Sequence, residues 1–318
     1  MLVMKILEKL INHFRALLLG NFPCKVNTIL RQTEINSMLL AKLHIQKTRE
    51  ANNIKSLKDV EFKVFSQWGE DGIIQYILSK IPIENEIFIE FGVENYTESN
   101  TRFLLINDNW KGLVIDGNPR HIEYIRRDPI YWQHDLTAIC QYITRENIND
   151  VIASAGISGD IGLLSIDIDG NDYWVWDVID IVKPRIVICE YNSVLGTDYA
   201  ITVPYEPHFI ATHAHYSGLY FGCSLPALCK LADIKGYKFI GSNSTGCNAF
   251  FVRKDLSQPF KVVTAKQGYI ESKIRTSKDK YGCLTYLSGK ERLDVIVDLD
   301  IYDLELGTTR PFKDLLTR

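Results

Sequence analysis

The segment that most constrains the fold covers residues 163–174 and reads Leu-Leu-Ser-Ile-Asp-Ile-Asp-Gly-Asn-Asp-Tyr-Trp. A short apolar run, typical of a buried strand, leads directly into a group of polar side chains. These are Asp167, Asp169, Asn171 and Asp172. Because ligands of open α/β sheets bind beyond the carboxyl ends of the strands, the segment predicts the edge of an active-site crevice.

The same segment is not an EF-hand calcium loop, although it opens with the pattern D-x-D-x-N. That loop requires glycine at its sixth position and glutamate at its twelfth. Counted from Asp167, these positions hold Asp172 and Val178. The sequence therefore excludes a calcium site of this type.

Around this segment, strand and helix patterns alternate, which predicts a parallel sheet with helices on both faces. The expected strands are residues 87–91, 112–115, 131–134, 161–166, 185–189, 238–241 and 248–252. The expected helices are residues 70–81, 100–107, 119–127, 139–155, 172–182 and 224–235. We expect three parts: an N-terminal helical appendage (1–57), an α/β domain (58–256) and a C-terminal extension (257–318).

The first 20 residues form an amphipathic pattern, with apolar residues on one helical face and charged residues between them. Those charges interrupt the apolar run too often for a transmembrane helix or a secretory signal. We expect the segment to pack on the protein or to pair with a partner or a second copy. Membrane contact would be peripheral at most.

Net charge and cysteine content limit the ligands and the cellular location that we expect. The 318 residues carry a net charge of −3, so no basic field indicates nucleic acid binding. The seven cysteines are scattered without a C-x-x-C pair. An odd number of cysteines on a chain of this length favours reduced thiols and a cytoplasmic location.

Several predicted strands end in an acidic residue. They end at Glu90, Asp116, Asp135, Asp167 and Glu190. After the first strand, Gly92 gives a turn where a cofactor could approach the backbone. Asp116 stands where an acidic residue commonly binds two ribose hydroxyls, and Asp135 could reach a base or its amine.

The dinucleotide fingerprint G-x-G-x-x-G is absent, because only Gly92 occupies the first turn. A pyrophosphate would lack its close approach to the backbone, which argues against NAD or FAD. The turn after the first strand is rich in glutamate, which would repel an anion but would accept a sulfonium cation.

At this point the chain resembles the FkbM-like branch of S-adenosylmethionine-dependent methyltransferases over roughly residues 60–256. The residues that carry the resemblance are Phe65-Ser-Gln-Trp-Gly-Glu-Asp71, Phe88-Ile-Glu-Phe-Gly92, Val114-Ile-Asp-Gly-Asn-Pro119, Leu164-Ser-Ile-Asp-Ile-Asp-Gly170 and Asn248-Ala-Phe-Phe-Val-Arg253. The first loop departs from the methyltransferase pattern, because Glu94-Asn-Tyr96 replaces the usual glycine-rich run.

The resemblance implies a Rossmann-like class I methyltransferase sheet of seven strands, whose last strand is antiparallel. It also implies methyl transfer to oxygen, often on sugars of surface polysaccharides or glycosylated metabolites. By position, Glu90, Gly92, Asp116 and Asp135 would hold the cofactor. Ser66, Gln67 and Glu70 would flank its methionine end. From the residues alone, Asp116 could instead form a turn and Ser66 could cap a helix.

Three interpretations of the acidic cluster stay open. Asp167, Asp169, Glu190 and Asn192 could supply oxygen ligands to Mg²⁺ or Mn²⁺, which would orient two substrate hydroxyls. Without a metal, Asp167 or Asp169 would act as general base or order the substrate. In the third interpretation, Asp169, Gly170 and Asn171 only form the turn and the helix cap.

The long segment 191–222 predicts a lid or a binding loop. We expect its histidines, His208, His213 and His215, to face solvent. Nearby aromatic residues could form a sugar-stacking surface or pack in the core and the lid. They are Trp174, Trp176, Tyr191, Tyr205, Tyr216 and Tyr220.

The predicted function is therefore an S-adenosylmethionine-dependent O-methyltransferase acting on a sugar or glycoside. Asp167, Asp169 and Asn171 are its candidate catalytic residues, and Gln67, Glu90, Gly92, Asp116 and Asp135 are its candidate cofactor contacts. Two alternatives belong to other classes. One is a metal-dependent hydrolase that uses Asp167, Asp169 and Glu190. The other is a non-catalytic assembly protein that docks through residues 1–20.

Overall fold

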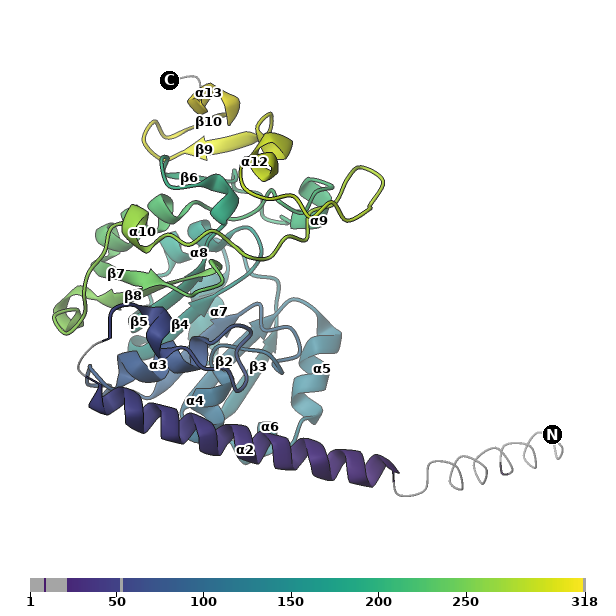
Figure 1. Cartoon of the computed structure of the whole chain (residues 1–318), viewed down its shortest axis with the longest axis vertical. Helices are drawn as coiled ribbons and strands as arrows, with labels where there is room; N and C mark the ends of the chain where they lie inside the picture. The colour runs from purple at the N-terminus through teal and green to yellow at the C-terminus, as the bar shows by residue number, and fades with distance from the viewer. Residues whose placement is uncertain (1–8, 10–21, 52–53, 317–318) are drawn as a thin grey trace.

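The structure is a computed structural model that describes residue 9 and residues 22–51 and 54–316 (Figure 1). Apart from Lys9, the amphipathic helix predicted for residues 1–20 lies outside the described residues. No helix in the described part of the chain has both the length and the apolar character needed to cross a membrane.

A seven-stranded sheet forms the centre of the molecule. Its strands are β1 (Ile87–Phe91), β2 (Lys111–Asp116), β3 (Leu136–Cys140), β4 (Gly159–Ile166), β5 (Val182–Glu190), β7 (Tyr237–Ser242) and β8 (Asn248–Arg253). Their spatial order is β3-β2-β1-β4-β5-β8-β7. All neighbours among the first five are parallel, whereas β8 runs antiparallel to both β5 and β7. The predicted Rossmann-like class I methyltransferase sheet, with its last strand antiparallel, is confirmed.

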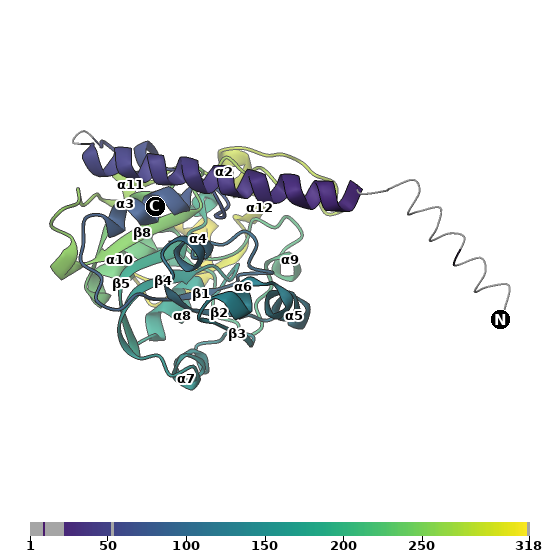
Figure 2. The ribbon, with the colours of Figure 1, turned by 90° about the horizontal axis from the view of Figure 1, so that it is seen from below.

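Helices cover both faces of this sheet (Figures 1 and 2). They are α3 (Glu70–Leu78), α4 (Arg102–Asn107), α5 (Pro119–Arg127), α6 (Ile130–Gln133), α7 (Ile148–Ser154), α8 (Asp172–Val178), α10 (Leu225–Lys235) and α11 (Ala265–Gly268), whereas α9 (Ala211–Ala214) belongs to the long loop. One apolar core packs residues of α3, α4 and α5 against the sheet, and the other packs α7, α8 and α10. On β4, Leu163 enters the first core and Leu164 the second, so both faces of this strand are buried.

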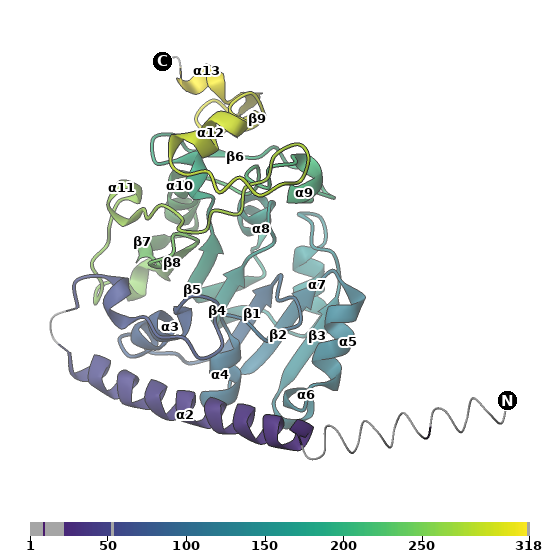
Figure 3. The same ribbon diagram turned by 45° about the vertical axis from the view of Figure 1, so that its right-hand side comes forward.

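Two further parts flank the sheet. Helix α2 (Phe22–Glu50) runs along one end of the domain, where Ala41 and Ile45 pack against Phe65 and Phe103 (Figure 3). It forms the N-terminal helical appendage. On the opposite side, β6 (Ile201–Thr202), β9 (Asp300–Asp303) and β10 (Thr308–Pro311) form a second sheet, beside α12 (Lys290–Ile296) and α13 (Lys313–Leu316). The proposed boundaries of the three parts stay a prediction.

The third strand differs from the prediction. Residues 130–133 are the short helix α6, and β3 begins after Asp135, at Leu136. The helix expected over 139–155 is therefore split into the end of β3 and the shorter α7. The aromatic run Tyr131-Trp132 suggested a strand, but Trp132 is 77% exposed and contributes little to the core.

Candidate functional site

A cavity of about 700 Å³ lies at the carboxyl edge of the sheet, where the sequence placed the crevice. It is bordered by the ends of β1 to β5 and by the first residue of β8. Its lining includes Gln67, Glu90, Gly92, Glu94, Glu98, Ser99, Asn100, Asp116, Asn118, His121, Gln141, Tyr142, Asp167, Asp169, Asn171, Glu190 and Asn248. No lysine or arginine is among the described residues that line it, so acidic side chains dominate its potential.

Gly92 forms the predicted turn after β1, but its role is to let two backbone segments meet. It adopts a φ of +69°, and a Cβ atom there would lie 1.6 Å from the carbonyl oxygen of Asp167. Only glycine fits this close approach. The turn thus brings the end of β1 into contact with the acidic segment. This contact alone explains why the position requires glycine, so the glycine is not evidence for a cofactor.

Glu90, at the end of β1, is 4% exposed and bound by the loop that follows. Its carboxylate accepts hydrogen bonds from the backbone N–H groups of Asn100 (2.9 Å) and Thr101 (3.1 Å), and from the hydroxyls of Ser99 and Thr101. Burial raises the pKa of this carboxyl group, and the hydrogen bonds oppose the rise. Glu90 therefore holds the loop that borders the cavity, and it contributes to the lining as well.

Asp116 forms the turn that the sequence offered as one of its two roles, and it also borders the cavity. One carboxylate oxygen accepts from the Glu94 N–H (2.9 Å), and the other accepts from the Asn118 N–H (2.7 Å) and lies 3.1 Å from His121 Nδ1. These contacts form the turn after β2. The side chain remains 10% exposed and borders the cavity, with acceptor capacity left for a ligand hydroxyl.

Asp135 does not reach the cavity, so its predicted role as a cofactor contact is wrong. It precedes β3, at the amino edge of the sheet, where its side chain is 67% exposed and lies 3.8 Å from Lys111 Nζ. The carboxyl end of β3 instead brings Gln141 and Tyr142 to the cavity. These two residues could not be identified from the sequence without the correct position of the strand.

At the start of α3, only Gln67 of the three predicted residues lines the cavity. Ser66 is buried, and its hydroxyl accepts from the Asp71 N–H at 3.1 Å. Glu70 is buried as well and accepts from the side-chain amides of Asn243 (2.7 Å) and Asn248 (3.0 Å). Ser66 therefore stabilises the beginning of the helix, and Glu70 connects the helix to β8.

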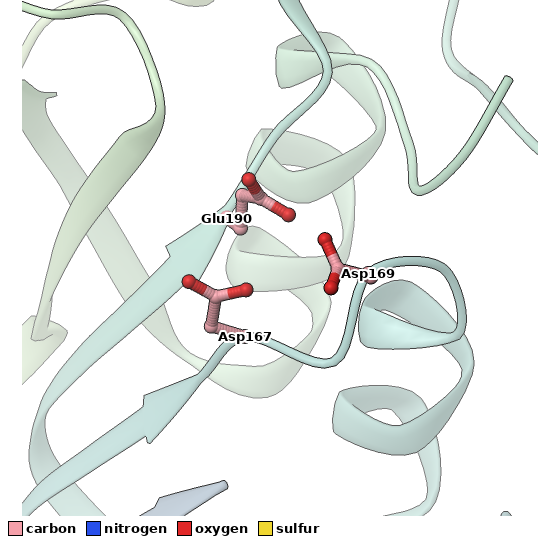
Figure 4. A group of neighbouring side chains, drawn as sticks. All are labelled: Asp167, Asp169 and Glu190. Atoms are coloured by element: carbon pink, nitrogen blue, oxygen red, sulfur yellow. The ribbon is translucent and has the colours of Figure 1, made fainter. Parts of the chain in front are cut away.

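The acidic cluster is the most unusual part of the cavity. In the register of β4 and β5, Ile166 pairs with Cys189, so Asp167 and Glu190 follow side by side. Figure 4 shows the carboxylates of Asp167, Asp169 and Glu190 converging on one space. One oxygen of each lies within 4.8 Å of one oxygen of each of the others. Within the described residues, no hydrogen bond reaches these three carboxylates.

Electrostatics in this cluster favour the protonated forms. Burial raises the pKa of Asp167 well above its usual value, and the charges of Asp169 and Asp172 raise it further. Burial and the charge of Asp167 do the same for Glu190. Burial also raises the pKa of Asp169. The site thus gathers acidic groups with raised pKa values and no lysine or arginine on the described lining, which is typical of functional carboxyl groups.

Asp172 has a different task from its neighbours. Its two oxygens accept from the N–H groups of Ile168 (2.8 Å) and Gly170 (2.9 Å), which fixes the turn after β4. This turn holds Asp169 at a φ of +55°, an uncommon conformation for a residue other than glycine. Burial raises the pKa of Asp172 to about 6.

Three buried oxygen atoms on the cavity lining also lack a partner: Asn171 Oδ1, Asn248 Oδ1 and Glu190 Oε2. Asn171 precedes α8 and uses its side-chain N–H to bind the Glu206 carbonyl at 2.9 Å. Asn248 pairs with Glu190 in the antiparallel register of β8 and β5. Buried polar atoms are rarely left unpaired, and these oxygens therefore add unpaired acceptors beside the acidic cluster.

Asn192 is not available as a metal ligand, so this part of the prediction is wrong. Its side-chain N–H groups bind the carbonyls of Leu219 (2.8 Å) and Phe221 (3.0 Å), and its side-chain oxygen accepts from the Val194 N–H (3.0 Å). The residue is 2% exposed and supports the long loop. The backbone turns into a short 3₁₀ helix after Asn192, so the strand alternation that placed it beside Glu190 ends there.

The long loop supplies few polar side chains to the site. His208 and His213 are exposed, as predicted, and His215 is half-buried. Trp174, Trp176 and Tyr191 are packed in the core rather than on a sugar-binding surface. Tyr142 donates a hydrogen bond to the Phe209 carbonyl at 2.5 Å, which ties the loop to the cavity wall.

Two residues that the sequence analysis did not select also line the cavity. His121 lies one turn into α5 and contacts Asp116, so its position five residues after that aspartate was the available signal. Asn248 begins the last strand and belongs to a motif already noted, but its contact with Glu190 depends on the antiparallel pairing.

No model of a protein family matches this chain, and no curated protein matches it in sequence. Among solved structures, it is similar to the N-terminal domain of EvdMO1 with SAH bound, with a TM-score of 0.40, 11% identity and coverage of 70% of this chain and 95% of that chain. It is also similar to PKMT2 from Rickettsia typhi (TM-score 0.38, 9% identity, 61% and 54% covered). The carbon methyltransferase of CurJ gives a TM-score of 0.36 at 10% identity, with 57% and 53% covered. These likenesses are distant, and the fold assignment rests on the strand order.

Proposed function

We propose that this protein is an S-adenosylmethionine-dependent methyltransferase that methylates a hydroxyl group of a sugar or glycoside. The observation that carries the proposal is the cavity at the carboxyl edge, with Asp116 at the end of β2 and a lining free of lysine and arginine among the described residues. A cavity with this lining suits a cofactor that has ribose hydroxyls and a positive charge but no phosphate.

The residues present fit the cofactor in chemical terms. Asp116 retains acceptor capacity for ribose hydroxyls. Gln141 and Tyr142 provide an amide and an aromatic ring where the base would lie, and Gln67 faces the same cavity. The cofactor would supply an electrophilic methyl group on a sulfonium, and the acidic lining favours that charge.

The protein's contribution to the reaction is positioning and proton removal. A hydroxyl that attacks the methyl group must lose its proton. Asp167, Asp169 and Glu190 are the carboxylates available to accept it. Their raised pKa makes their ionised forms stronger bases than ordinary carboxylates. Asn171 and Asn248 also border the cavity, and each has a side-chain oxygen without a hydrogen-bond partner.

The finer parts of the proposal rest on the sequence. Transfer to oxygen, a sugar acceptor and the FkbM-like branch follow from the resemblance of residues 60–256. The many hydrogen-bond acceptors of the cavity support a polyhydroxyl acceptor, because each hydroxyl brings a donor. A cytoplasmic location and a second copy as partner stay predictions. So does the docking role of residues 1–20, which lie, except for Lys9, outside the described residues.

A divalent cation is a second candidate ligand, favoured by the unpaired carboxylates. Asp167, Asp169 and Glu190 offer a set of oxygen ligands of the kind that Mg²⁺ and Mn²⁺ prefer. Bound there, the ion would lower the pKa of a hydroxyl beside it. Activity that depends on Mn²⁺ but not on S-adenosylmethionine would favour the metal-dependent hydrolase.

Titration calorimetry with S-adenosylmethionine tests the proposal. We expect binding that Asp116→Ala weakens by about tenfold, equivalent to about 1.4 kcal/mol. Asp135→Ala is the matched control, because Asp135 also flanks a strand but lies at the opposite edge. Failure of the folded wild-type protein to bind, with and without Mg²⁺ and in the presence of a glycan acceptor, would refute the methyltransferase and leave the hydrolase or the assembly protein.

A further inference from the structure

We propose that the acceptor is an anionic glycan, and that residues 273–290, here called the basic strap, bind its negative charges. The inference deepens the proposed function and rests on it. It starts from a contrast in charge: the strap contains five basic residues and one acidic residue in a chain with a net charge of −3. The basic residues are Lys273, Arg275, Lys278, Lys280 and Lys290.

The positive charges of the strap are exposed, and the Arg275 guanidinium donates hydrogen bonds to the carbonyls of residues 286 and 287. All five basic side chains are exposed. In the described part of the chain, no ion pair involves any of them. Asp279, the acidic residue of the strap, uses its carboxylate to accept from the N–H groups of Tyr281 and Cys283, both at 2.9 Å. The strap therefore presents a positive surface to solvent.

The strap begins beside the candidate active site. The Ser272 N–H donates to Ser193 Oγ at 3.0 Å, and the Lys273 N–H donates to the Thr245 carbonyl at 3.1 Å. Ser193 lies three residues after Glu190, and Thr245 lies three residues before Asn248. Figure 3 shows this segment crossing the end of the domain between α11 and α9. Further along, the Lys278 N–H binds the Ser217 carbonyl at 3.1 Å, which fixes the strap to the long loop.

The strap also carries aromatic rings suited to sugars. Tyr281 is 79% exposed and Tyr286 is 55% exposed. Exposed tyrosines combine a flat apolar face with a polar hydroxyl, which suits the mixed surface of a sugar ring. Basic and aromatic side chains together fit a chain of sugars that bears carboxylates or similar anions.

The acidic cavity and the basic strap together indicate how such an acceptor would lie on the protein. The carboxylates of the cavity repel an anion, so the sugar that enters must present neutral hydroxyls. The strap attracts anions, so the charged sugars of the same chain would lie outside the cavity. This arrangement favours an acidic polysaccharide or oligosaccharide over a neutral glycan.

Fluorescence anisotropy with a labelled hyaluronan oligosaccharide, in which uronic acids alternate with neutral sugars, tests the inference. We expect the wild-type protein to bind it and a neutral maltooligosaccharide of equal length to bind much more weakly. Replacing Lys273, Arg275, Lys278 and Lys280 by glutamine should weaken binding by about tenfold. The matched control replaces four exposed basic residues of and near α2, Arg31, Lys42, Lys47 and Lys55, and should retain binding.

Calorimetry with S-adenosylmethionine on the same variants separates the two proposals. Cofactor binding by both variants, with loss of glycan binding only in the strap variant, would support the inference. Wild-type protein that binds the cofactor but binds both glycans equally, or prefers a single-stranded oligonucleotide, would overturn it and leave the methyltransferase intact. Glycan binding by a protein that fails to bind the cofactor, even with the glycan present, would remove the acceptor role.

Discussion

Strands β4 and β5 together carry acidic side chains at both ends, but these are paired with arginines only at the amino edge of the sheet. At the amino edge, Asp160 of β4 accepts hydrogen bonds from Arg185 of β5 (2.9 Å) and from Arg253 of β8 (2.5 Å). At the carboxyl edge, Asp167 and Glu190 converge with Asp169, and no cation is present among the described residues nearby. The same strands thus carry a compensated cluster at one end and an uncompensated cluster at the other.

The pKa values of the carboxyl groups shift in opposite directions at the two edges. Burial would raise the pKa of Asp160, but the hydrogen bonds and charges of Arg253 and Arg185 outweigh it and lower the pKa. At the other end, burial and neighbouring carboxylates raise the pKa of Asp167 and Glu190. Amino-edge charge therefore stabilises the fold, whereas carboxyl-edge charge costs stability and is explained best by a function.

The largest expected effect separates activity from stability at the carboxyl edge. Asp167→Asn removes one of the clustered carboxylates. We expect methyl transfer to fall by at least about a hundredfold, because general-base catalysis contributes on that scale. We also expect the free energy of unfolding to rise, because a source of repulsion is removed. Initial rates and urea titrations measure the two quantities.

The matched control for Asp167→Asn is Asp150→Asn, at an exposed residue of α7. This variant should leave both the rate and the stability close to the wild-type values. Loss of stability in Asp167→Asn, parallel to its loss of activity, would contradict the comparison, because it would make the cluster a structural element.

The second prediction concerns the amino edge. Arg185 is 4% exposed, and it binds Asp160, the Pro82 carbonyl (2.6 Å) and Glu84 (3.2 Å). Arg185→Met should lower the free energy of unfolding by about 1–2 kcal/mol, because it removes the hydrogen bonds of a buried guanidinium to Asp160 and to the Pro82 carbonyl. Lys183→Met, at an exposed position of the same strand, is the control. Cofactor binding measured on the folded variants should not change.

The residues at the two edges could be predicted from the sequence only where the apolar pattern of the strand was clear. The uninterrupted apolar runs of β4 and β5 located both strands and, with them, Asp167 and Glu190. Strand β3 alternates buried and half-exposed residues, and Thr137 and Cys140 interrupt its apolar pattern. The aromatic residues before it matched a strand pattern more closely, so the strand was predicted too early in the chain, at residues 131–134. Asp135 was therefore placed at the carboxyl edge, although it lies at the amino edge.

Side-chain partners were less predictable than strand ends. Glu90 is bound by residues 99–101, and Asn192 by carbonyls of residues 219 and 221. These contacts depend on how the loops fold back, which no local pattern encodes. An acidic or amide residue at a strand end therefore predicts a place on the sheet edge, but not whether the side chain is free.

The third prediction is a pH dependence that differs between the edges. The unfolded chain releases its carboxyl protons near pH 4. The folded protein retains the carboxyl-edge protons to higher pH, to about 6 for Asp172. Because the folded state then binds more protons, its free energy of unfolding should fall as pH rises from about 4 to 6. The lowered pKa of Asp160 acts oppositely, and its stabilisation is lost as pH falls below about 4.

Urea titrations at several pH values would measure this slope. In Asp167→Asn the slope should be smaller, because a carboxyl group whose pKa is raised by burial no longer titrates in the folded state. Equal slopes in the wild-type protein and in Asp167→Asn would show that Asp167 titrates as it does in the unfolded chain. The carboxyl edge would then be no more strained than the amino edge.

The smallest expected effect tests the placement of Asp135. Its side chain and that of Lys111 are 67% and 44% exposed, and the pair is separated by 3.8 Å, so water screens the attraction. Asp135→Ala should change the free energy of unfolding by less than about 0.5 kcal/mol and leave cofactor binding unaltered. If it weakened cofactor binding as much as Asp116→Ala, the carboxyl end of the third strand would have to lie at Asp135. Because Gly112 N–H binds the Asp135 carbonyl at 2.8 Å at the beginning of β2, such a strand would also require a new register between β2 and β3.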